Sequence, residues 1–369
     1  MAKAGPGTKT NVPRGKRATS YDVARLAAVS QSAVSRAFTP DAYISPSMRK
    51  KVLAAARQLG YQPNAIARGL TTSRSRVVAL FMPNIGNPIY PFVLQTFSHR
   101  LRSHGRQILL LPLVENANEA LACMLQYQID GLVITAASPL ALSKAIARKC
   151  LSAGIPVVLF NRYFADLKVA SVNCDNARGG ALAAEILHGA GHQRFAFIGG
   201  PEETSTHIDR YRGFADRLRA LGTVAPLIET GPYTYDGGHG AGMRLFARRD
   251  RPDAIFCAND VLAIGALDAA RVGHGLRVPR DASIIGFDGA PMAAWAGNDL
   301  TTIALRLDAM VERTVEVLLR AIDGQHAGSE PIRIPGDLVI RKSARMPGGS
   351  LPAASTWPRG TPQKERGAR

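Results

Sequence analysis

Polar side chains follow several strand-like segments, and they could bind a small hydroxylated molecule. The residues at these carboxyl ends are Asn84, Asn161, Asn259, Asp260 and Asp288. Parallel α/β sheets bind ligands beyond the carboxyl ends of their strands, so polar groups gathered there suit a binding site. A carboxylate accepts hydrogen bonds from ligand hydroxyls, whereas an amide can also donate them. For each single residue, ordinary capping of a loop or helix is the alternative.

The elements that must position these groups alternate between strand and helix from Arg76 onward. Strand-like runs occupy 77–83, 107–113, 130–135, 155–161, 194–200, 225–230, 253–260 and 282–288. Helical stretches such as 92–105 and 211–222 lie between them, which predicts parallel sheets with crossover helices. The second half repeats the plan of the first, with IPVVLFN (155–161) equivalent to ASIIGFD (282–288). We therefore expect two similar α/β units with a cleft between them.

A second group of candidate residues lies in SYDVARLAAVSQSAVSRAF (20–38), which reads as two short helices with a break at Ala28-Val29. Thr19 and Asp22 suit a capping box, and Ser30 suits the cap of the second helix. Apolar residues share one face of that helix, and Gln31, Ser32, Ser35 and Arg36 lie on or beside the opposite face. A third helix begins at Ser45-Pro46 and ends at Gly60, with Arg49, Lys50 and Lys51 on its outer face.

The net charge of +18 is concentrated at the two ends of the chain. Residues 1–76 carry a net +12 and residues 341–369 a net +6, whereas 77–340 are neutral. A basic head on a neutral body indicates a nucleic-acid partner. Two short helices of this kind suit a helix-turn-helix, in which Gln31 and Arg36 could read base edges while Tyr21 and the third helix hold phosphates. A small protein-binding helical module is the alternative.

Composition favours a soluble, cytoplasmic protein. The start of the chain has no apolar core of a signal peptide, and no apolar run is long enough to cross a bilayer. The four cysteines are far apart and suit buried, reduced thiols rather than a metal site, and we expect no cofactor. A periplasmic sugar-binding protein is one alternative, but it would need a signal peptide, which the sequence does not show, and it would have no helix-turn-helix. A sugar-active enzyme is the other alternative, but the sequence contains no GxSxG, GxxxxGK[ST], HExxH or CxxC motif.

Several ordered motifs give the chain a specific resemblance. They are Tyr21-Asp22-Val23-Ala24, Val34-Ser35-Arg36, Leu59-Gly60-Tyr61-Gln62-Pro63-Asn64, Ala67-Arg68-Gly69-Leu70, Arg210-Tyr211-Arg212-Gly213-Phe214, Ala258-Asn259-Asp260 and Gly286-Phe287-Asp288. Together they cover about residues 18–345, and the chain resembles the lactose-repressor (LacI/GalR) family of bacterial transcriptional regulators. The resemblance implies an α/β fold: a helix-turn-helix head joined by a hinge helix to a two-subdomain body like a periplasmic binding protein, with parallel sheets.

The resemblance also assigns roles to individual residues. The hinge helix corresponds to Asn64–Thr71, and Leu70 matches the leucine that wedges into the minor groove of operator DNA. Together, the helix-turn-helix and the hinge helix give the DNA-binding set Tyr21, Ser30, Gln31, Ser32, Ser35, Arg36, Asn64 and Leu70. The resemblance gives an effector-binding set of Asn161, Arg210, Tyr233, Asn259 and Asp288. Two alternatives stay open: Arg210 and Asp288 could pair with each other across the cleft, and Tyr233 could be a core residue.

Departures from the family pattern limit what the resemblance implies. Ala28 replaces a frequent turn glycine, and Ser20 replaces an apolar residue. The tail after Ala344 has no leucine heptad, so we expect a homodimer rather than a tetramer. We expect a disordered basic arm at 1–17, the head at 18–62, the hinge and linker at 63–75, and a disordered tail at 346–369. The body at 76–345 would divide into an N-subdomain (about 76–175 and 304–333) and a C-subdomain (about 176–303 and 334–345).

The predicted function is that of a sequence-specific transcriptional regulator, a repressor. Its partners would be double-stranded operator DNA and a carbohydrate-like effector in the inter-subdomain cleft.

Overall fold

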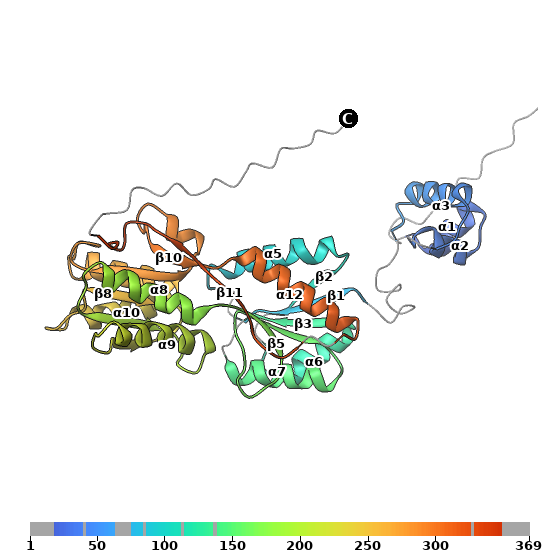
Figure 1. The fold of residues 1–369 in the computed structure, drawn as a ribbon. Helices are drawn as coiled ribbons and strands as arrows, with labels where there is room; N and C mark the ends of the chain where they lie inside the picture. The colour runs from blue at the N-terminus through green and yellow to red at the C-terminus, as the bar shows by residue number, and fades with distance from the viewer. Residues whose placement is uncertain are drawn as a thin grey trace, which may run out of the picture. The chain divides into compact units, whose positions relative to one another are not determined.

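The computed structural model describes residues 18–39, 42–62, 75–83, 86–111, 114–135, 139–325 and 328–348. The chain forms two compact units, Met1–Ser75 and Arg76–Arg369 (Figure 1). We call the first unit the head and the second the body. The predicted hinge, the arm and most of the tail lie outside the described residues.

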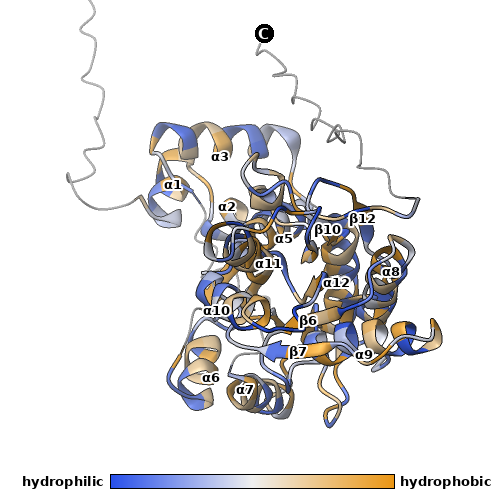
Figure 2. Cartoon of the chain, turned by 90° about the vertical axis from the view of Figure 1, so that its left-hand side faces the viewer, coloured by the Kyte–Doolittle hydropathy of each residue, from blue (hydrophilic) through white to orange (hydrophobic). Residues whose placement is uncertain are grey.

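Three helices build the head: α1 (Ser20–Ala27), α2 (Gln31–Ala37) and α3 (Pro46–Gln58). The predicted capping box is confirmed, because Thr19 and Asp22 each accept a hydrogen bond from the other's backbone. The predicted caps at Ser30 and Ser45 are also confirmed. Apolar faces of all three helices meet in one small core. In Figure 2, α3 carries orange and blue residues in alternation, as expected for a helix with one buried face.

One basic residue of the head has a different place from the one the sequence suggested. Arg49 does not lie on a solvent face of α3 ready to hold a phosphate. Its guanidinium donates to the carbonyl oxygens of Ala37 (3.0 Å) and Ala42 (3.2 Å). Ala37 ends α2, where unpaired carbonyls and the helix dipole favour a cation. Arg49 therefore joins the end of α2 to α3.

The body contains two six-stranded sheets, each in its own lobe (Figure 1). The first lobe's sheet has the order β11-β5-β4-β3-β1-β2 and is parallel throughout. Its strands are β1 (Val77–Phe81), β2 (Gln107–Leu111), β3 (Gly131–Ile134), β4 (Val157–Phe160), β5 (Ala170–Cys174) and β11 (Ile332–Ile334). Alternate residues of β1 enter different cores, with Leu80 in one and Phe81 in the other.

The helices of the first lobe cover both faces of its sheet. One face packs against α5 (Tyr90–Ser103) and α12 (Leu307–Ile322), and the other against α6 (Ala117–Gln126) and α7 (Leu140–Ser152). Figure 1 shows α12, in orange, beside α5, in cyan, although about 200 residues separate them in the chain. The first lobe is therefore completed by the C-terminal part of the chain.

The second lobe repeats the same plan. Its sheet has the order β12-β10-β9-β8-β6-β7, and only β12 runs antiparallel to its neighbour. Its strands are β6 (Phe195–Gly199), β7 (Leu227–Thr230), β8 (Ala254–Cys257), β9 (Ser283–Asp288), β10 (Thr301–Ala304) and β12 (Asp337–Val339). Its helices are α8 (Asn176–Gly189), α9 (Ser205–Ala220), α10 (Tyr235–Phe246) and α11 (Asp260–Asp268), with a π-turn η1 (Ala269–Gly273) and a 3₁₀-turn η2 (Pro291–Ala294).

The chain crosses between the lobes three times: after β5, after β10 and after β11. The second and third crossings lie next to the approximate boundaries expected near residues 303–304 and 333–334. Ala304 still belongs to the second lobe, because it pairs with Asp288 in β9. Ile334 still belongs to the first lobe, because it pairs with Cys174 in β5. In the part of the chain that the structure describes, no helix is long and apolar enough to span a membrane.

Candidate functional sites

The polar face of α2 is presented to solvent because its apolar face is used by the core. Val34 is almost fully buried, whereas the side chains of Gln31, Ser32, Ser35 and Arg36 are exposed. Ser30 has a structural role as well, since its hydroxyl accepts a hydrogen bond from the backbone of Ala33 at 3.2 Å. We call the four exposed residues of α2 the reading edge.

Two residues of α1, Ser20 and Tyr21, are relevant to DNA binding together with the reading edge. Tyr21 is 65% exposed, which leaves its phenol free to meet a phosphate. Gln31 donates from Nε2 to the hydroxyl of Ser20 at 3.1 Å. Ser20 was not among the predicted binding residues; its polar type at a usually apolar position was the available signal. Between the two helices Ala28 adopts φ +48°, the left-handed conformation that a glycine would adopt with less strain.

The two remaining predicted DNA-binding residues, Asn64 and Leu70, lie outside the described residues. Their roles therefore remain predictions.

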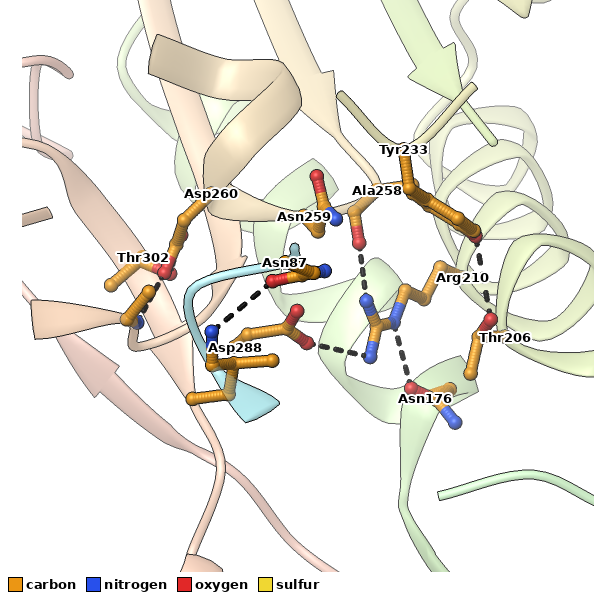
Figure 3. A network of polar contacts seen from close by, with 12 residues as sticks. Asn87, Asn176, Thr206, Arg210, Tyr233, Ala258, Asn259, Asp260, Asp288 and Thr302 are labelled. Carbon is orange, nitrogen blue, oxygen red and sulfur yellow. Dashed lines mark hydrogen bonds and ion pairs between the residues drawn. The ribbon is translucent and has the colours of Figure 1, made fainter. Parts of the chain in front are cut away.

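A buried ion pair forms the centre of a polar site in the second lobe (Figure 3). Arg210, on α9, is 2% exposed and donates from Nη2 to Oδ1 of Asp288 at 3.1 Å. Its Nε donates to Oδ1 of Asn176 at 2.8 Å, and its Nη1 donates to the carbonyl of Ala258. The guanidinium also lies 3.6 Å over the ring of Phe287. Arg210 and Asp288 do pair, as one alternative held, but within one lobe rather than across the cleft.

Both the charge and the backbone conformation of Asp288 are energetically unfavourable. Burial raises the pKa of its carboxyl, although the positive charge of Arg210 opposes the rise. Its backbone has φ +103°, a conformation that L-residues rarely adopt. Gly289 follows with φ +73°, and a Cβ there would lie 2.5 Å from Cβ of Ala304. Strain and desolvation of this kind collect at binding sites, where the surrounding structure compensates for them.

Asn259 and Asp260 lie beside this pair, at the end of β8. The side-chain oxygen of Asn259 accepts from the backbone of Leu262 at 2.9 Å, so Asn259 caps α11, as the capping alternative held. The cap uses its oxygen and not its amide hydrogens. Asp260 accepts from the backbone of Ala290 at 2.6 Å and from the hydroxyl of Thr302 at 2.5 Å. Burial raises the pKa of Asp260 to about 8, so this carboxyl is protonated at neutral pH.

Tyr233 is half-buried and covers one side of the same site (Figure 3). Its ring lies against the backbone of Gly200, where a Cβ would come within 2.1 Å of it. Its hydroxyl is 3.4 Å from the hydroxyls of Thr204 and Thr206. The ring therefore packs against its own lobe, and its partial exposure distinguishes it from a core residue.

Asn161 lies in the first lobe, directly after β4, at the position equivalent to Asp288. It also has a positive φ, +56°, and its buried Oδ1 has no hydrogen-bond partner. The internal repeat thus places a strained polar residue at the same strand end in each lobe. An unpaired buried oxygen is costly unless a ligand satisfies it.

Three polar residues near this site were missed by the sequence reasoning. Asn176 holds Arg210, and it follows a strand, β5, that was not predicted because ASVNC lacks an apolar run. Arg162 and Tyr90 lie together near Tyr233; Arg162 is buried, whereas Tyr90 is half-buried. Arg162 had one signal, its place directly after Asn161. Tyr90 begins a helix and had none.

Among the described residues, no group of three or more His, Cys, Asp or Glu side chains could hold a metal ion. The site instead offers hydrogen-bond donors, acceptors and an aromatic face. Such groups suit noncovalent binding of a small polar molecule. A helix-turn-helix head on a two-lobed body with this site defines the class: a DNA-binding regulator with a ligand-binding body.

Comparison with known proteins agrees with this class. Residues 19–64 match the bacterial regulatory proteins of the lacI family, and residues 184–344 match the periplasmic binding protein-like domain. The HTH-type transcriptional repressor CytR of Escherichia coli K12 is 32% identical over 333 residues, which cover 89% of this chain and 96% of CytR. Catabolite control protein A of Priestia megaterium is 29% identical, with 89% and 99% covered.

The chain belongs to the lacI family of bacterial regulatory proteins. It is a DNA-binding transcriptional regulator rather than an enzyme. Among solved structures, a lac repressor dimer bound to operator and an anti-inducer matches with a TM-score of 0.78 at 25% identity, covering 89% of this chain and 99% of that one. A regulator, CelR, in complex with cellobiose matches with a TM-score of 0.66 at 27% identity, covering 89% and 100%. The predicted fold class is confirmed.

Proposed function

We propose that this chain is a homodimeric repressor that binds a roughly palindromic operator and is controlled by a small carbohydrate-like effector. The observation that carries the proposal is the buried Arg210–Asp288 pair beside Asn259 and Tyr233 in the body of a DNA-binding regulator. The relatives named above include repressors, a dimer on operator and a complex with a sugar. Since operator DNA is its partner, we place its action in the cytoplasm.

The reading edge on α2 would enter the major groove. Arg36 can make a bidentate contact to guanine, and Gln31 can do so to adenine. Ser30, Ser32, Ser35 and Tyr21 would hold phosphates or add base contacts. Twofold symmetry of the dimer would match the two half-sites of the operator. Asn64 and Leu70 would act at the centre, where Leu70 wedges into the minor groove and kinks the DNA.

The effector would lie between the lobes. Asp288 and Asn161 would accept its hydroxyl protons, Arg210 and Asn259 would donate to its oxygens, and the ring of Tyr233 would cover its apolar face. The unpaired oxygen of Asn161 in the first lobe and the strained Asp288 in the second would both gain partners from one ligand.

Contacts within the body connect this site to the segments that cross between the lobes. The carbonyl of Asp288 accepts a hydrogen bond from the backbone of Leu305 at 3.1 Å, in the second crossing. Arg210 bonds to Asn176, which directly follows the first crossing. Asp175, at that crossing, donates from its backbone to Ile334 at 2.8 Å, next to the third crossing. A ligand that moves Asp288 or Arg210 would therefore shift the angle between the lobes, and operator affinity with it.

The test begins with selection of bound sequences from random DNA by the purified chain. The Arg36→Ala variant should then lose about tenfold or more in affinity for the selected operator, because one bidentate base contact gives about 1–3 kcal/mol of discrimination. Arg102→Ala, which removes the same charge from an exposed position on α5, should keep full affinity. Enrichment of no sequence, or equal affinity for the Arg36→Ala variant, would contradict the assignment of the reading edge.

A further inference from the structure

One buried cation in the body, Arg162, forms no salt bridge with any residue that the structure describes. Arg162 follows Asn161 at the end of β4 and is 6% exposed. Its Nε makes one long hydrogen bond, 3.4 Å, to the carbonyl of Thr135. Its Nη1 is buried and has no hydrogen-bond partner. A buried guanidinium N–H without an acceptor is unfavourable in a desolvated place, so something outside the described contacts should satisfy it.

The groups around Arg162 come from both lobes and belong to the proposed effector site. They are the phenols of Tyr90 and Tyr233, the guanidinium of Arg210 and the carboxyl of Asp288. Tyr90 lies in the first lobe, whereas Tyr233, Arg210 and Asp288 lie in the second. Arg162 therefore faces the space between the lobes, where the effector would bind.

Arg162 forms no salt bridge with a carboxylate among the described residues. Among the described residues, the only carboxyl group found to act on Arg162 is that of Asp288, and Asp288 is already bonded to Arg210. Asp260 is protonated at neutral pH and adds no charge. Arg210, by contrast, pairs with Asp288 and also interacts with the carboxyl group of Asp209.

The internal repeat shows where a second carboxylate could have been. Asn161 occupies the position in the first lobe that Asp288 occupies in the second, and both have a positive φ. Asn161 is an amide, so it brings no negative charge to the site. The site as built is complementary to a ligand that brings its own negative charge.

We infer that the effector is a hydroxylated anion, a sugar acid or a sugar phosphate, whose charged group binds Arg162. A guanidinium forms paired hydrogen bonds with carboxylate and phosphate, which suits either group. The inference rests on the proposed function of the inter-lobe site and names the class of ligand that this site takes. Hydroxyls of the same ligand would meet Asn161, Asn259 and Asp288.

Matched ligands test the inference on the full chain. Thermal shift and titration calorimetry would compare glucose with gluconate and glucose 6-phosphate, galactose with galacturonate, and ribose with ribose 5-phosphate, at constant ionic strength. At least one anion should raise Tm and bind at least about tenfold more tightly than its neutral parent. The carboxylate and phosphate members of the panel show which anion the site takes.

Substitution of Arg162 makes the test specific. Arg162→Gln keeps a donor for Thr135 but removes the charge, and it should weaken binding of the preferred anion at least about thirtyfold. The effect on the neutral parent should be below about threefold. Arg102→Gln, at an exposed position on α5, serves as the charge-matched control and should change neither. A circular dichroism spectrum and a Tm like those of the wild type show that the variant folds.

Three results would overturn the inference: no anion in the panel binds, a neutral sugar binds more tightly than its anion, or Arg162→Gln leaves anion affinity unchanged. None of them removes operator binding, so the regulator itself would still stand. Loss of operator selection would instead contradict the proposed function. An Asn161→Asp variant adds an independent check, because a carboxylate beside Arg162 should lower anion affinity about tenfold or more.

Discussion

Asp260 makes the stability of the second lobe depend on pH in a direction that can be measured. Its carboxyl is 1% exposed and contacts the backbone of Ala290 and the hydroxyl of Thr302. Burial raises its pKa from 3.8 to about 8. Between about pH 4 and pH 8 the folded lobe therefore keeps a proton that the unfolded chain releases, so stability falls as pH rises.

The magnitude follows from the size of the pKa change. Each pKa unit corresponds to about 1.4 kcal/mol, so ionisation of Asp260 opposes folding by about 6 kcal/mol once the pH exceeds 8. Between pH 5.5 and pH 8 the loss is about 3 kcal/mol. Asp260→Asn reproduces the protonated form, because its oxygen can accept from Ala290 and its amide can donate to Thr302. The variant should therefore lack this loss.

The assay is urea unfolding of the wild type and Asp260→Asn at pH 5.5 and pH 8, followed by the fluorescence of Trp295 in the same lobe. The difference between the two proteins should grow by about 3 kcal/mol in favour of the variant at the higher pH. Asp216→Asn is the control, because Asp216 is an exposed aspartate on α9 of the same lobe. A difference in unfolding free energy between Asp260→Asn and the wild type that is the same at pH 5.5 and pH 8 would refute this prediction.

Two further predictions concern the head and the hinge. Arg49→Met should lower the free energy of unfolding of the head by about 2 kcal/mol, because it removes charged hydrogen bonds to the end of α2; hydrogen exchange of the α2 amides measures this, with exposed Lys50→Met as the control, and equal protection in both variants would count against it. Leu70→Ala should reduce operator bending because no side chain wedges between the central base pairs; circular-permutation electrophoresis measures the bend, and an unaltered angle would remove Leu70 from that role.

Much of the fold could be predicted because local rules and tertiary packing agree in this chain. The capped helices of the head show this agreement, as do apolar strands such as β4 and β9. The strands β5, β10, β11 and β12 were missed. Two of them, β11 and β12, have only three residues. In β10, polar residues such as Thr301 and Thr302 are buried only because neighbouring strands and helices cover them. Burial of that kind depends on contacts distant in sequence, which local patterns do not contain.

The candidate effector site was predictable where it coincided with a strand end or a family motif, as for Arg210 and Asp288. Arg162 was not singled out, because an arginine after a strand is ordinary in sequence. Its unusual property, a buried guanidinium whose Nη1 has no hydrogen-bond partner, exists only in the folded body. The position expected for Arg49 was wrong for the opposite reason. A cation on a helix near DNA suggests a phosphate contact, but the nearby carbonyls of α2 bind it.

The proposed function requires that the Arg210–Asp288 site control binding of DNA by the head. The most direct test measures operator affinity by fluorescence anisotropy for the wild type and for Asp288→Asn, each with and without the panel anion that gives the largest thermal shift. Both proteins should bind the operator equally without ligand. The ligand should change the affinity of the wild type about tenfold or more and leave that of the variant unchanged. A ligand response of Asp288→Asn equal to that of the wild type would contradict the account.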